Sequence, residues 1–442
     1  MDSTNKQNGN VVAIITMIFL FGMISFVTNL AAPIGVIWKQ QPGIEGSNAL
    51  GMMGNMMNFL AYLFMGIPAG KLLTKIGYKK TALAAIAIGF FGVLIQYLSG
   101  ILGVGAQLFG LPTNFYLYLL GAFVAGFSVC MLNTVVNPML TLLGGGGKKG
   151  NQFVQIGGTF NSLMGTLTPM LVGALIGSVT KNTVIADVNP VLFIAMGVFV
   201  VAFFLLSFIP ITDPQQQSEH IVFESSPWAF RHFVFGVISI FLYVGVEVGI
   251  PGTLNFFLSD PDPSKGAQMD PATAATIAGF VAGTYWFLML IGRFISSFIS
   301  GKVSSKIQLT VAATLAIVLI LGAIAAPIAT KVSMPVFTGS GFSMAQVPMT
   351  ALLLVLCGLC TSVMWGSIFN LAVEGLGKYT AMASGTFMMM VVGGGVLPLF
   401  QNWIADVTTY KASYGVIVIA LAFILFYAAI GSKNVNKDIK VD

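Results

Sequence analysis

Long apolar segments constrain this chain more than any other feature of its sequence. The run from Val11 to Trp38 contains no charged side chain, and comparable runs recur almost to the end of the chain. A helix needs about 20 apolar residues to cross the hydrocarbon core of a bilayer. Only 8% of the residues are charged, against about 25% in soluble domains, so water cannot solvate most of the surface. The chain is therefore predicted to be an integral membrane protein whose main partner is the lipid bilayer.

The segments predict an all-α polytopic membrane protein with twelve transmembrane helices. A transmembrane β-barrel is excluded, because its strands alternate apolar and polar residues and these segments are continuously apolar. The first segment is too long for a signal peptide and has no small-residue cleavage site, so we expect it to stay as a helix. The spans are expected near residues 11–38, 49–73, 81–103, 115–143, 151–178, 190–211, 230–258, 272–300, 309–329, 349–373, 379–406 and 414–431.

A polar stretch over residues 212–229 divides the spans six and six. It contains three consecutive glutamines and two prolines, which is typical of a loop. We predict an N-terminal six-helix bundle over 1–211, a cytoplasmic linker over 212–229 and a C-terminal six-helix bundle over 230–442. The motif Gly-Thr-Phe at Gly158 recurs 227 residues later at Gly385, which indicates a duplication. Two pseudo-repeated six-helix bundles with a cavity between them form the major facilitator fold.

Basic residues in the loops predict the orientation, because cytoplasmic loops carry more Lys and Arg than external loops. With the N-terminus inside, fourteen of the 20 basic residues face the cytoplasm, five face outside and Arg293 lies in the membrane. We expect a monomer in a bacterial inner membrane, with both termini in the cytoplasm. The five basic residues expected outside are Lys39, Lys181, Lys265, Lys331 and Lys411.

No basic run is interleaved with aromatic residues, so nucleic acid is not an expected partner.

Two ionisable residues lie deep within predicted spans, where a charge costs about 2.5–3.5 kcal/mol. Glu247 is the one deep acid among 14 acidic residues. We expect Glu247 to bind and release the proton whose movement would drive transport, although a neutral Glu can also simply pack against a neighbouring helix. Arg293 is the one deep base. It could partner Glu247, but its place about two turns before a basic loop favours a structural or gating role near the helix end.

Amide side chains are numerous in the spans and suit a neutral, hydroxyl-rich ligand. An amide both donates and accepts hydrogen bonds, as sugar hydroxyl groups require, and aromatic rings can cover the C–H faces of a pyranose. Some of these amides could instead bond one helix to another. The predicted substrate-binding residues are Asn29, Asn58, Asn133, Asn137, Gln155, Asn161, Tyr243, Asn255, Trp286, Trp365 and Asn370.

Other patterns give no catalytic or metal site. Cys357 and Cys360 form a C-x-x-C pair without a second ligand pair or a nearby His, so simple packing is the favoured interpretation. The glycine run 144–147 before Lys148 and Lys149 lacks the strand and the Ser/Thr of a phosphate-binding loop, and we expect a flexible basic loop. We therefore expect no cofactor, no metal ion and no enzyme activity, with transport driven by a gradient or running downhill.

Longer motifs carry a family resemblance over nearly the whole chain. The loop 70–80 resembles the signature loop of the major facilitator superfamily, with Thr74 in place of the usual Asp. Segments 132–138 and 159–162 resemble the fucose–proton symporter family, which includes glucose/galactose transporters, and 243–248, 291–294 and 393–395 continue that resemblance. It implies uptake of a neutral monosaccharide, a hexose or fucose-like sugar, by proton-coupled symport with alternating access. It also implies that Lys75 and Lys79 of the signature loop act in gating.

Two departures from that family bear on coupling. Members resembling the fucose symporter have a Glu at the position of Asn133 and an Asp at the position of Ala32. Glu247 matches the glucose/galactose branch, so proton coupling would have to depend on Glu247. A sodium-coupled or uncoupled sugar transporter is the first alternative. A drug or metabolite antiporter, or a non-transporting membrane sensor, is the second.

Overall fold

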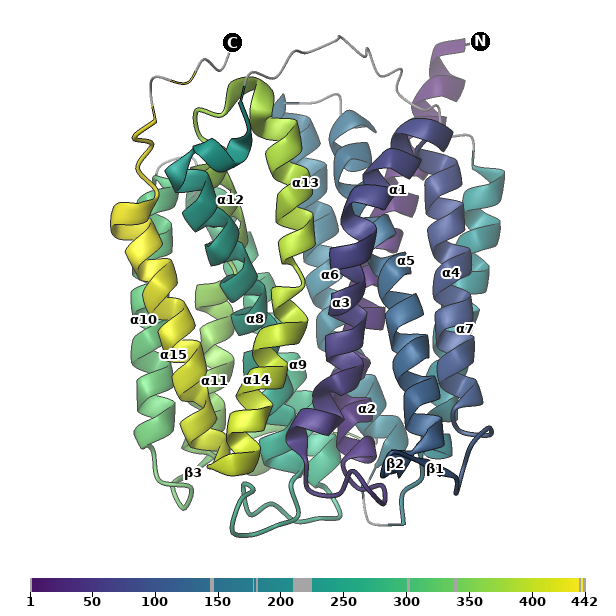
Figure 1. Ribbon diagram of the computed structural model, residues 1–442, viewed down its shortest axis with the longest axis vertical. Helices are drawn as coiled ribbons and strands as arrows, with labels where there is room; N and C mark the ends of the chain where they lie inside the picture. Colours follow the sequence, from purple (N-terminus) through teal and green to yellow (C-terminus); the bar gives the residue numbers. More distant parts are fainter. Residues whose placement is uncertain are drawn as a thin grey trace.

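The helices of the chain run side by side along one axis (Figure 1). The structure, a computed structural model, describes residues 2–143, 147–177, 179, 182–209, 225–299, 303–337, 341–436 and 439. Within these ranges, twelve helical spans are long and apolar enough to cross a membrane, which confirms the predicted all-α polytopic fold. The first helix begins and the last one ends at the same end of the molecule. We call this the terminal end, and the opposite one the distal end.

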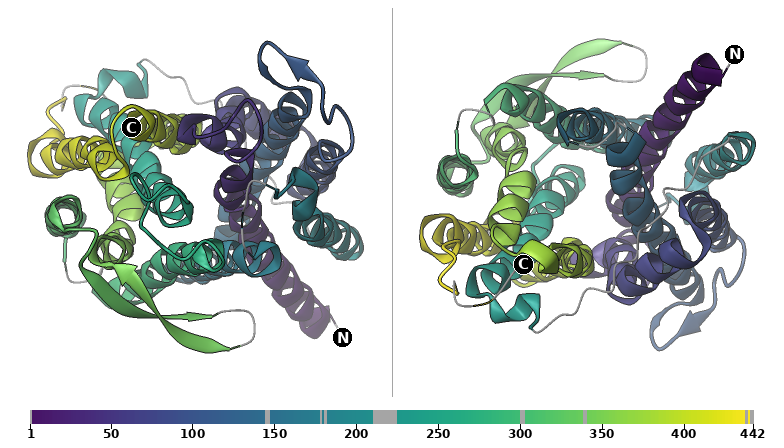
Figure 2. Two further views of the ribbon diagram at one scale, coloured as in Figure 1. Left: turned by 90° about the horizontal axis from the view of Figure 1, so that it is seen from below. Right: turned by 90° about the horizontal axis from the view of Figure 1, so that it is seen from above.

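The helices before residue 210 pack mainly on one another, and those after residue 224 do the same (Figure 2). We call these groups the N-terminal and C-terminal bundles. The boundaries predicted for the linker stay a prediction, because residues 210–224 lie outside the described ranges. The first bundle contains α1 (Asp2–Thr28), α2 (Ala31–Trp38), α3 (Asn48–Ile76), α4 (Tyr78–Leu98), β1 (Gln107–Leu108), β2 (Leu111–Pro112), α5 (Thr113–Leu143), α6 (Gly147–Ile176), η1 (Ile185–Val188) and α7 (Asn189–Phe208). The second contains η2 (Pro227–Ala229), α8 (Arg231–Ser259), α9 (Ala274–Ile299), α10 (Ser305–Ala325), β3 (Lys331–Phe337), β4 (Phe342–Pro348), α11 (Met349–Thr361), α12 (Met364–Val373), η3 (Gly377–Tyr379), α13 (Thr380–Met390), α14 (Gly393–Val407), α15 (Tyr410–Phe426) and η4 (Tyr427–Gly431).

Three of the predicted spans are broken helices rather than continuous ones. The span 11–38 breaks between α1 and α2 at Asn29, four residues before Pro33, whose missing N–H group cannot bond the Asn29 carbonyl. The span 379–406 breaks between α13 and α14, directly before three consecutive glycines, which are poor helix formers. The span 349–373 breaks between α11 and α12. Such breaks expose backbone polar groups at membrane depth, where protein or ligand groups must satisfy them.

Other differences concern the ends of spans and one connection. The spans predicted at 81–103, 190–211 and 309–329 begin and end a few residues earlier, as α4, α7 and α10, and α1 begins at Asp2. Lys148 and Lys149 belong to the first turn of α6 rather than to a loop. The connection after α10 is an antiparallel hairpin, β3–β4, paired from Lys331↔Pro348 to Phe337↔Phe342. Its period-two pattern buries Met334 and Val336 on one face.

Glycines allow close contact between the bundles. Gly173 of α6 and Gly279 of α9 lie against each other, so that an added methyl group on either would meet the other helix. Gly394 and Gly395 of α14 lie in the same way against Phe59 and the backbone of α3. Small residues at helix crossings let backbones approach in lipid. We call these four positions the glycine seam.

Candidate functional site

Arg293 of α9 and Glu247 of α8 form an ion pair between the helices of the C-terminal bundle. Arg293 Nη2 lies 3.4 Å from Glu247 Oε1, and the two side chains are 21% and 13% exposed. Arg293 Nη1 donates to Ser162 Oγ at 2.8 Å and to the Gly158 carbonyl at 3.2 Å, both on α6. The arginine therefore joins its acid partner to the opposite bundle. The pairing with Glu247 that the sequence allows for Arg293 occurs, whereas a gating role for Arg293 stays a prediction.

A pair of aromatic side chains lies one helical turn from the acid. Tyr243, one turn before Glu247 on α8, interacts with Glu247 and Arg293 and donates to the Thr361 carbonyl at 3.2 Å. Trp365 of α12 lies edge-on to the Tyr243 ring, with the ring centroids 6.2 Å apart. Tyr243 is fully buried and Trp365 is partly exposed. Of the two rings, only that of Trp365 retains exposed surface.

Ser25 of α1 and Trp286 of α9 come from different bundles and both lie close to Gly165 of α6, while Asn29 bonds Ser25. A methyl group on Gly165 would lie 2.9 Å from Ser25 Oγ of α1 and 3.2 Å from the Trp286 ring of α9. Asn29 donates to the Ser25 carbonyl at 2.9 Å and lies 3.2 Å from its hydroxyl group. Helices α1, α6 and α9 thus place polar groups and an indole ring together where the two bundles meet.

Asn133 and Asn137 of α5 lie one turn apart and are half-buried. Asn133 Nδ2 donates to Tyr62 Oη of α3 at 2.7 Å, and Asn137 Nδ2 donates to the Asn133 carbonyl at 3.3 Å. Tyr62 stacks on Phe59 with centroids 6.0 Å apart, and Phe59 contacts Gly394 across the glycine seam. Asn133 therefore lies beside an aromatic ring that packs near the opposite bundle, and sugar binding by Asn133 and Asn137 stays a prediction.

The remaining predicted amides are scattered. Asn161 Nδ2 donates to the Phe21 carbonyl at 2.8 Å and so links α6 to α1, which favours the helix-bonding alternative for this residue. Asn58 is 4% exposed within α3, whereas Asn370 is exposed on α12. The side chain of Gln155 lies outside the described part of the chain.

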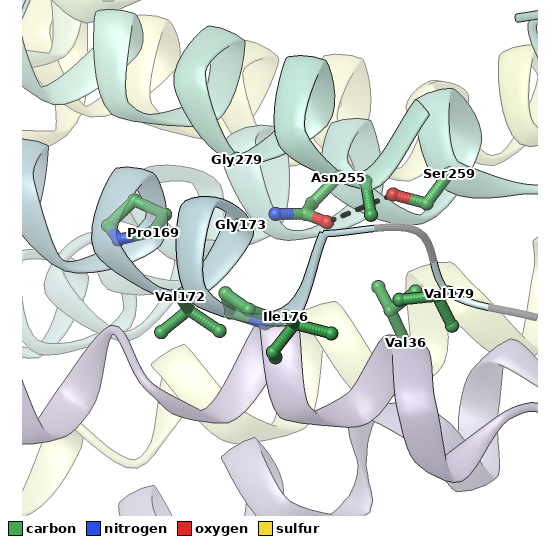
Figure 3. A pocket seen from close by; sticks show the side chains of 11 residues that line it. Val36, Pro169, Val172, Gly173, Ile176, Val179, Asn255, Ser259 and Gly279 are labelled. Carbon is green, nitrogen blue, oxygen red and sulfur yellow. Dashed lines mark hydrogen bonds between the residues drawn. The ribbon is translucent and has the colours of Figure 1, made fainter. Parts of the chain in front are cut away.

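Asn255 faces a narrow pocket between the bundles near the distal end (Figure 3). Its Oδ1 accepts from Ser259 Oγ at 3.4 Å, and Val36 of α2 and Pro169 of α6 lie across from it. The free volume is about 10 Å³, which is about the room that one water molecule needs. A sugar does not fit, so the boundary is closed here. Asn255 can contact a sugar only in a conformation in which this region opens.

The two signature-loop lysines lie at the terminal end. Lys75 is exposed in the last turn of α3. Lys79 Nζ donates to the carbonyls of Ser207 at 2.9 Å and Ile209 at 2.7 Å, and so satisfies free carbonyl groups at the end of α7. This contact braces the N-terminal bundle internally. Gating by Lys75 and Lys79 stays a prediction.

A polar network at the distal end is not predicted from the sequence. Lys39 Nζ lies 2.6 Å from Asp260 Oδ2 and donates to Tyr410 Oη at 2.6 Å, and none of the three residues is more than 9% exposed. Burial lowers the pKa of the Lys39 ammonium, while Asp260 opposes the shift. Sequence reasoning places Lys39 in an external loop and Asp260 and Tyr410 at helix ends. There such residues are common, and no signal marks them.

The cysteines give no sign of metal binding. Cys357 and Cys360 are buried free thiols, and Cys357 Sγ donates to the Leu353 carbonyl at 3.5 Å. Across the described ranges, no group of three or more His, Cys, Asp or Glu residues could hold a metal ion. The packing interpretation of the C-x-x-C pair agrees with this burial.

Comparison with known proteins decides the family. Residues 14–354 match the profile of the Major Facilitator Superfamily. The chain belongs to this superfamily. The membership confirms the family resemblance carried by the sequence motifs, and it makes the protein a multi-pass membrane transporter. The described ranges contain twelve helices that are long and apolar enough to be its spans.

Relatives of this facilitator extend over most of its length. It is 28% identical to the glucose/galactose transporter of Brucella abortus, over 98% of this chain and 96% of that protein. It is 29% identical to a putative glucose/galactose transporter of Helicobacter pylori, over 85% and 86%. It is 23% identical to the L-fucose-proton symporter of Escherichia coli, over 79% and 77%.

Solved structures share the facilitator fold. The E. coli fucose:proton symporter matches with a TM-score of 0.64 at 18% identity, over 96% of this chain and 100% of that chain. A D-xylose-proton symporter matches with a TM-score of 0.65 at 13% identity, over 95% and 98%. At these identities the likeness concerns the fold alone.

Proposed function

We propose that this facilitator takes up a neutral monosaccharide, a hexose or a fucose-like sugar, by proton-coupled symport. Relatives named glucose/galactose transporter and L-fucose-proton symporter support the substrate class. The observation that carries the proposal is the Glu247–Arg293 pair, because one arginine joins a membrane acid to the opposite bundle. The bundles over 1–211 and 230–442 rock about the linker 212–229. The protein acts as a monomer in a bacterial inner membrane, with both termini in the cytoplasm.

Protonation of Glu247 is the proposed coupling step. An ionised Glu247 attracts Arg293 and draws its guanidinium group toward α8. A proton on the carboxyl group removes that charge, so Arg293 keeps its bonds to Gly158 and Ser162 on α6 and loses its hold on α8. The indirect link from α8 to α6, which runs through Arg293 of α9, therefore depends on the proton. A group whose proton affinity differs between two conformations shifts their equilibrium when it is protonated.

The sugar is proposed to bind where the two bundles meet. Asn133 and Asn137 supply donors and acceptors from the N-terminal bundle. Trp286 and Trp365 supply indole rings from the C-terminal bundle, and Asn29 lies at the boundary between the two. A neutral sugar suits this set of side chains, because its hydroxyl groups need amide partners and its C–H faces need apolar cover.

The coupling proposal is tested with Glu247→Gln in proteoliposomes. Gln keeps the shape of the side chain but cannot ionise. We expect accumulation driven by an imposed proton gradient to be lost, while sugar binding and counterflow persist. The matched control is Glu374→Gln, which changes an exposed acid in the loop after α12. If Glu247→Gln still concentrates sugar with a proton gradient alone, Glu247 is not the proton carrier.

The same assay separates the alternatives. Accumulation by the wild-type protein with a sodium gradient alone would make the protein a sodium-coupled transporter. Equilibration without accumulation under either gradient would make it an uncoupled one. A panel of radiolabelled sugars that shows no uptake at all would leave the drug or metabolite antiporter and the non-transporting sensor.

A further inference from the structure

We propose that Lys39, Asn48, Asp260, Asp406 and Tyr410 form a latch that holds the distal ends of the two bundles together and sets their conformational equilibrium. We call this set the distal latch. The inference rests on the proposed function for one point, namely that the bundles alternate between two conformations.

The first part of the latch is the ion pair between Lys39 and Asp260. Lys39 follows α2 in the N-terminal bundle and Asp260 follows α8 in the C-terminal bundle. Their charged atoms lie 2.6 Å apart, and the residues are 5% and 9% exposed. Charges removed from water to this extent are stable only with a close partner. When the distal ends separate, water can solvate both groups again, so the pair belongs to the closed conformation.

Tyr410 connects this pair to a third element. Its Oη lies 2.7 Å from Asp260 Oδ2 and 2.6 Å from Asn48 Oδ1, and it accepts from Lys39 Nζ. The hydroxyl group has one proton, and the carboxylate attracts that proton more strongly than an amide does. With the Asn48 amide turned by half a rotation, its NH₂ group donates to Tyr410 Oη, and the tyrosine gives its own proton to Asp260. One buried hydroxyl group therefore joins the start of α15 to the start of α3.

The second part of the latch is Asp406 of α14, which binds the N-terminus of α3. Its Oδ1 accepts from Asn48 N at 2.6 Å, and its Oδ2 accepts from Ala49 N and Ser47 Oγ at 3.0 Å. A carboxylate is favourable here, because the first N–H groups of a helix lack partners and carry partial positive charge. Ser47 Oγ also accepts from Leu50 N. The helix thus keeps a cap of its own when Asp406 departs, so the Asp406 contact can break without unwinding α3.

The bonds of Lys39 to Asp260 and Tyr410, of Tyr410 to Asn48 and of Asp406 to the start of α3 cross from one bundle to the other, so these must break before the distal end can open. The narrow pocket at Asn255 shows the same end closed. A neighbouring acid provides the contrast, because the carboxylate of Asp262 accepts from the backbone N–H and the hydroxyl group of Ser264 in its own loop. Its bond to Asp260 comes from its backbone N–H group, which Asp262→Asn keeps. Weakening the latch should therefore shift the population toward the distal-open conformation, and changing Asp262 should not.

The test measures the distance between the bundles directly. Cysteines for spin labels replace Glu45 and Ser264, two exposed residues on opposite sides of the latch, in a chain whose three native cysteines are changed to Ala. Double electron–electron resonance on the purified full-length protein then gives the fraction of distal-open molecules. We expect Lys39→Ala and Asp406→Asn each to raise that fraction by about tenfold or more. Asp262→Asn is the matched control and should leave it unchanged.

A third variant guards against failure to fold. Lys39→Ala leaves Asp260 without its charge partner, whereas Tyr410→Phe removes one hydroxyl group and keeps the ring packing, so we expect a smaller shift in the same direction. Distances equal to wild type in all three latch variants would overturn the proposal, as would an equal shift in Asp262→Asn. The experiment contains no sugar and no gradient. Its failure would therefore not bear on the proposed transport, and a failure of sugar uptake would not bear on the latch.

Discussion

Replacing Arg293 with Met removes the guanidinium group while keeping most of the side-chain length, and the structure gives the size of the effect. The variant loses a 2.8 Å bond to Ser162, a 3.2 Å bond to the Gly158 carbonyl and the 3.4 Å pair with Glu247. A hydrogen bond to a charged group contributes about 1.5–3 kcal/mol, and removing one partner of a fully buried pair costs about 3–5 kcal/mol. The pair retains some exposure and its distance is long, so we expect a loss of about 3 kcal/mol.

The Glu247→Gln variant and the double variant complete a cycle that isolates the pair. Glu247→Gln should cost about 1 kcal/mol, because Arg293 keeps both bonds to α6. The coupling energy between the two positions should be about 1–2 kcal/mol. Unfolding free energies in mixed micelles measure all four proteins, with Glu374→Gln as an additional control. A coupling energy below about 0.5 kcal/mol would show that Arg293 acts through α6 alone and that the charge of Glu247 does not hold it, which would refute the coupling step.

Two further predictions concern topology and the sugar. With both termini cytoplasmic, Ser264→Cys should react with an impermeant thiol reagent added to intact cells, and Ser305→Cys should react only after permeabilisation. Labelling of Ser305→Cys in intact cells would show that the topology is the reverse of the predicted one. Asn133→Ala and Asn137→Ala should each weaken sugar binding in isothermal titration by about 1–3 kcal/mol, because a sugar hydroxyl group loses its partner. Asn161→Ala, which removes a bond between α6 and α1, should lower stability rather than affinity. Wild-type affinity in both α5 variants would exclude α5 from the site.

The class of fold could be predicted because the bilayer imposes a simple condition on sequence. Each span must be apolar over about 20 residues, so composition and segment length were enough to find twelve of them. The breaks within spans follow from local chemistry that the apolar pattern hides. Pro33 interrupts the first span and three glycines begin α14, yet both breaks lie inside segments that contain no charged residue.

A residue of the candidate site was easier to predict when placing its side chain in the membrane costs more free energy. A charge at membrane depth is so unfavourable that Glu247 and Arg293 stand out in the sequence, and the structure pairs them. Amides cost far less, so Asn133 beside Tyr62 and Asn161 on a helix carbonyl look alike until their partners are known. The distal latch could not be found, because Lys39 and Asp260 are 221 residues apart and neither is unusual for its place in the chain.

The glycine seam also bears on which substitutions the protein tolerates. At Gly279 or Gly394, even the single carbon of Ala would strike the neighbouring helix, whereas the large apolar residues that face lipid, such as Phe204 and Ile419, are exposed and can be exchanged for others of similar hydropathy. In most soluble proteins the bulky buried residues are the least replaceable. Here the smallest residues should be the ones that tolerate the fewest substitutions. In a library of variants, most functional members should carry their changes on the lipid-facing surface of the same helices.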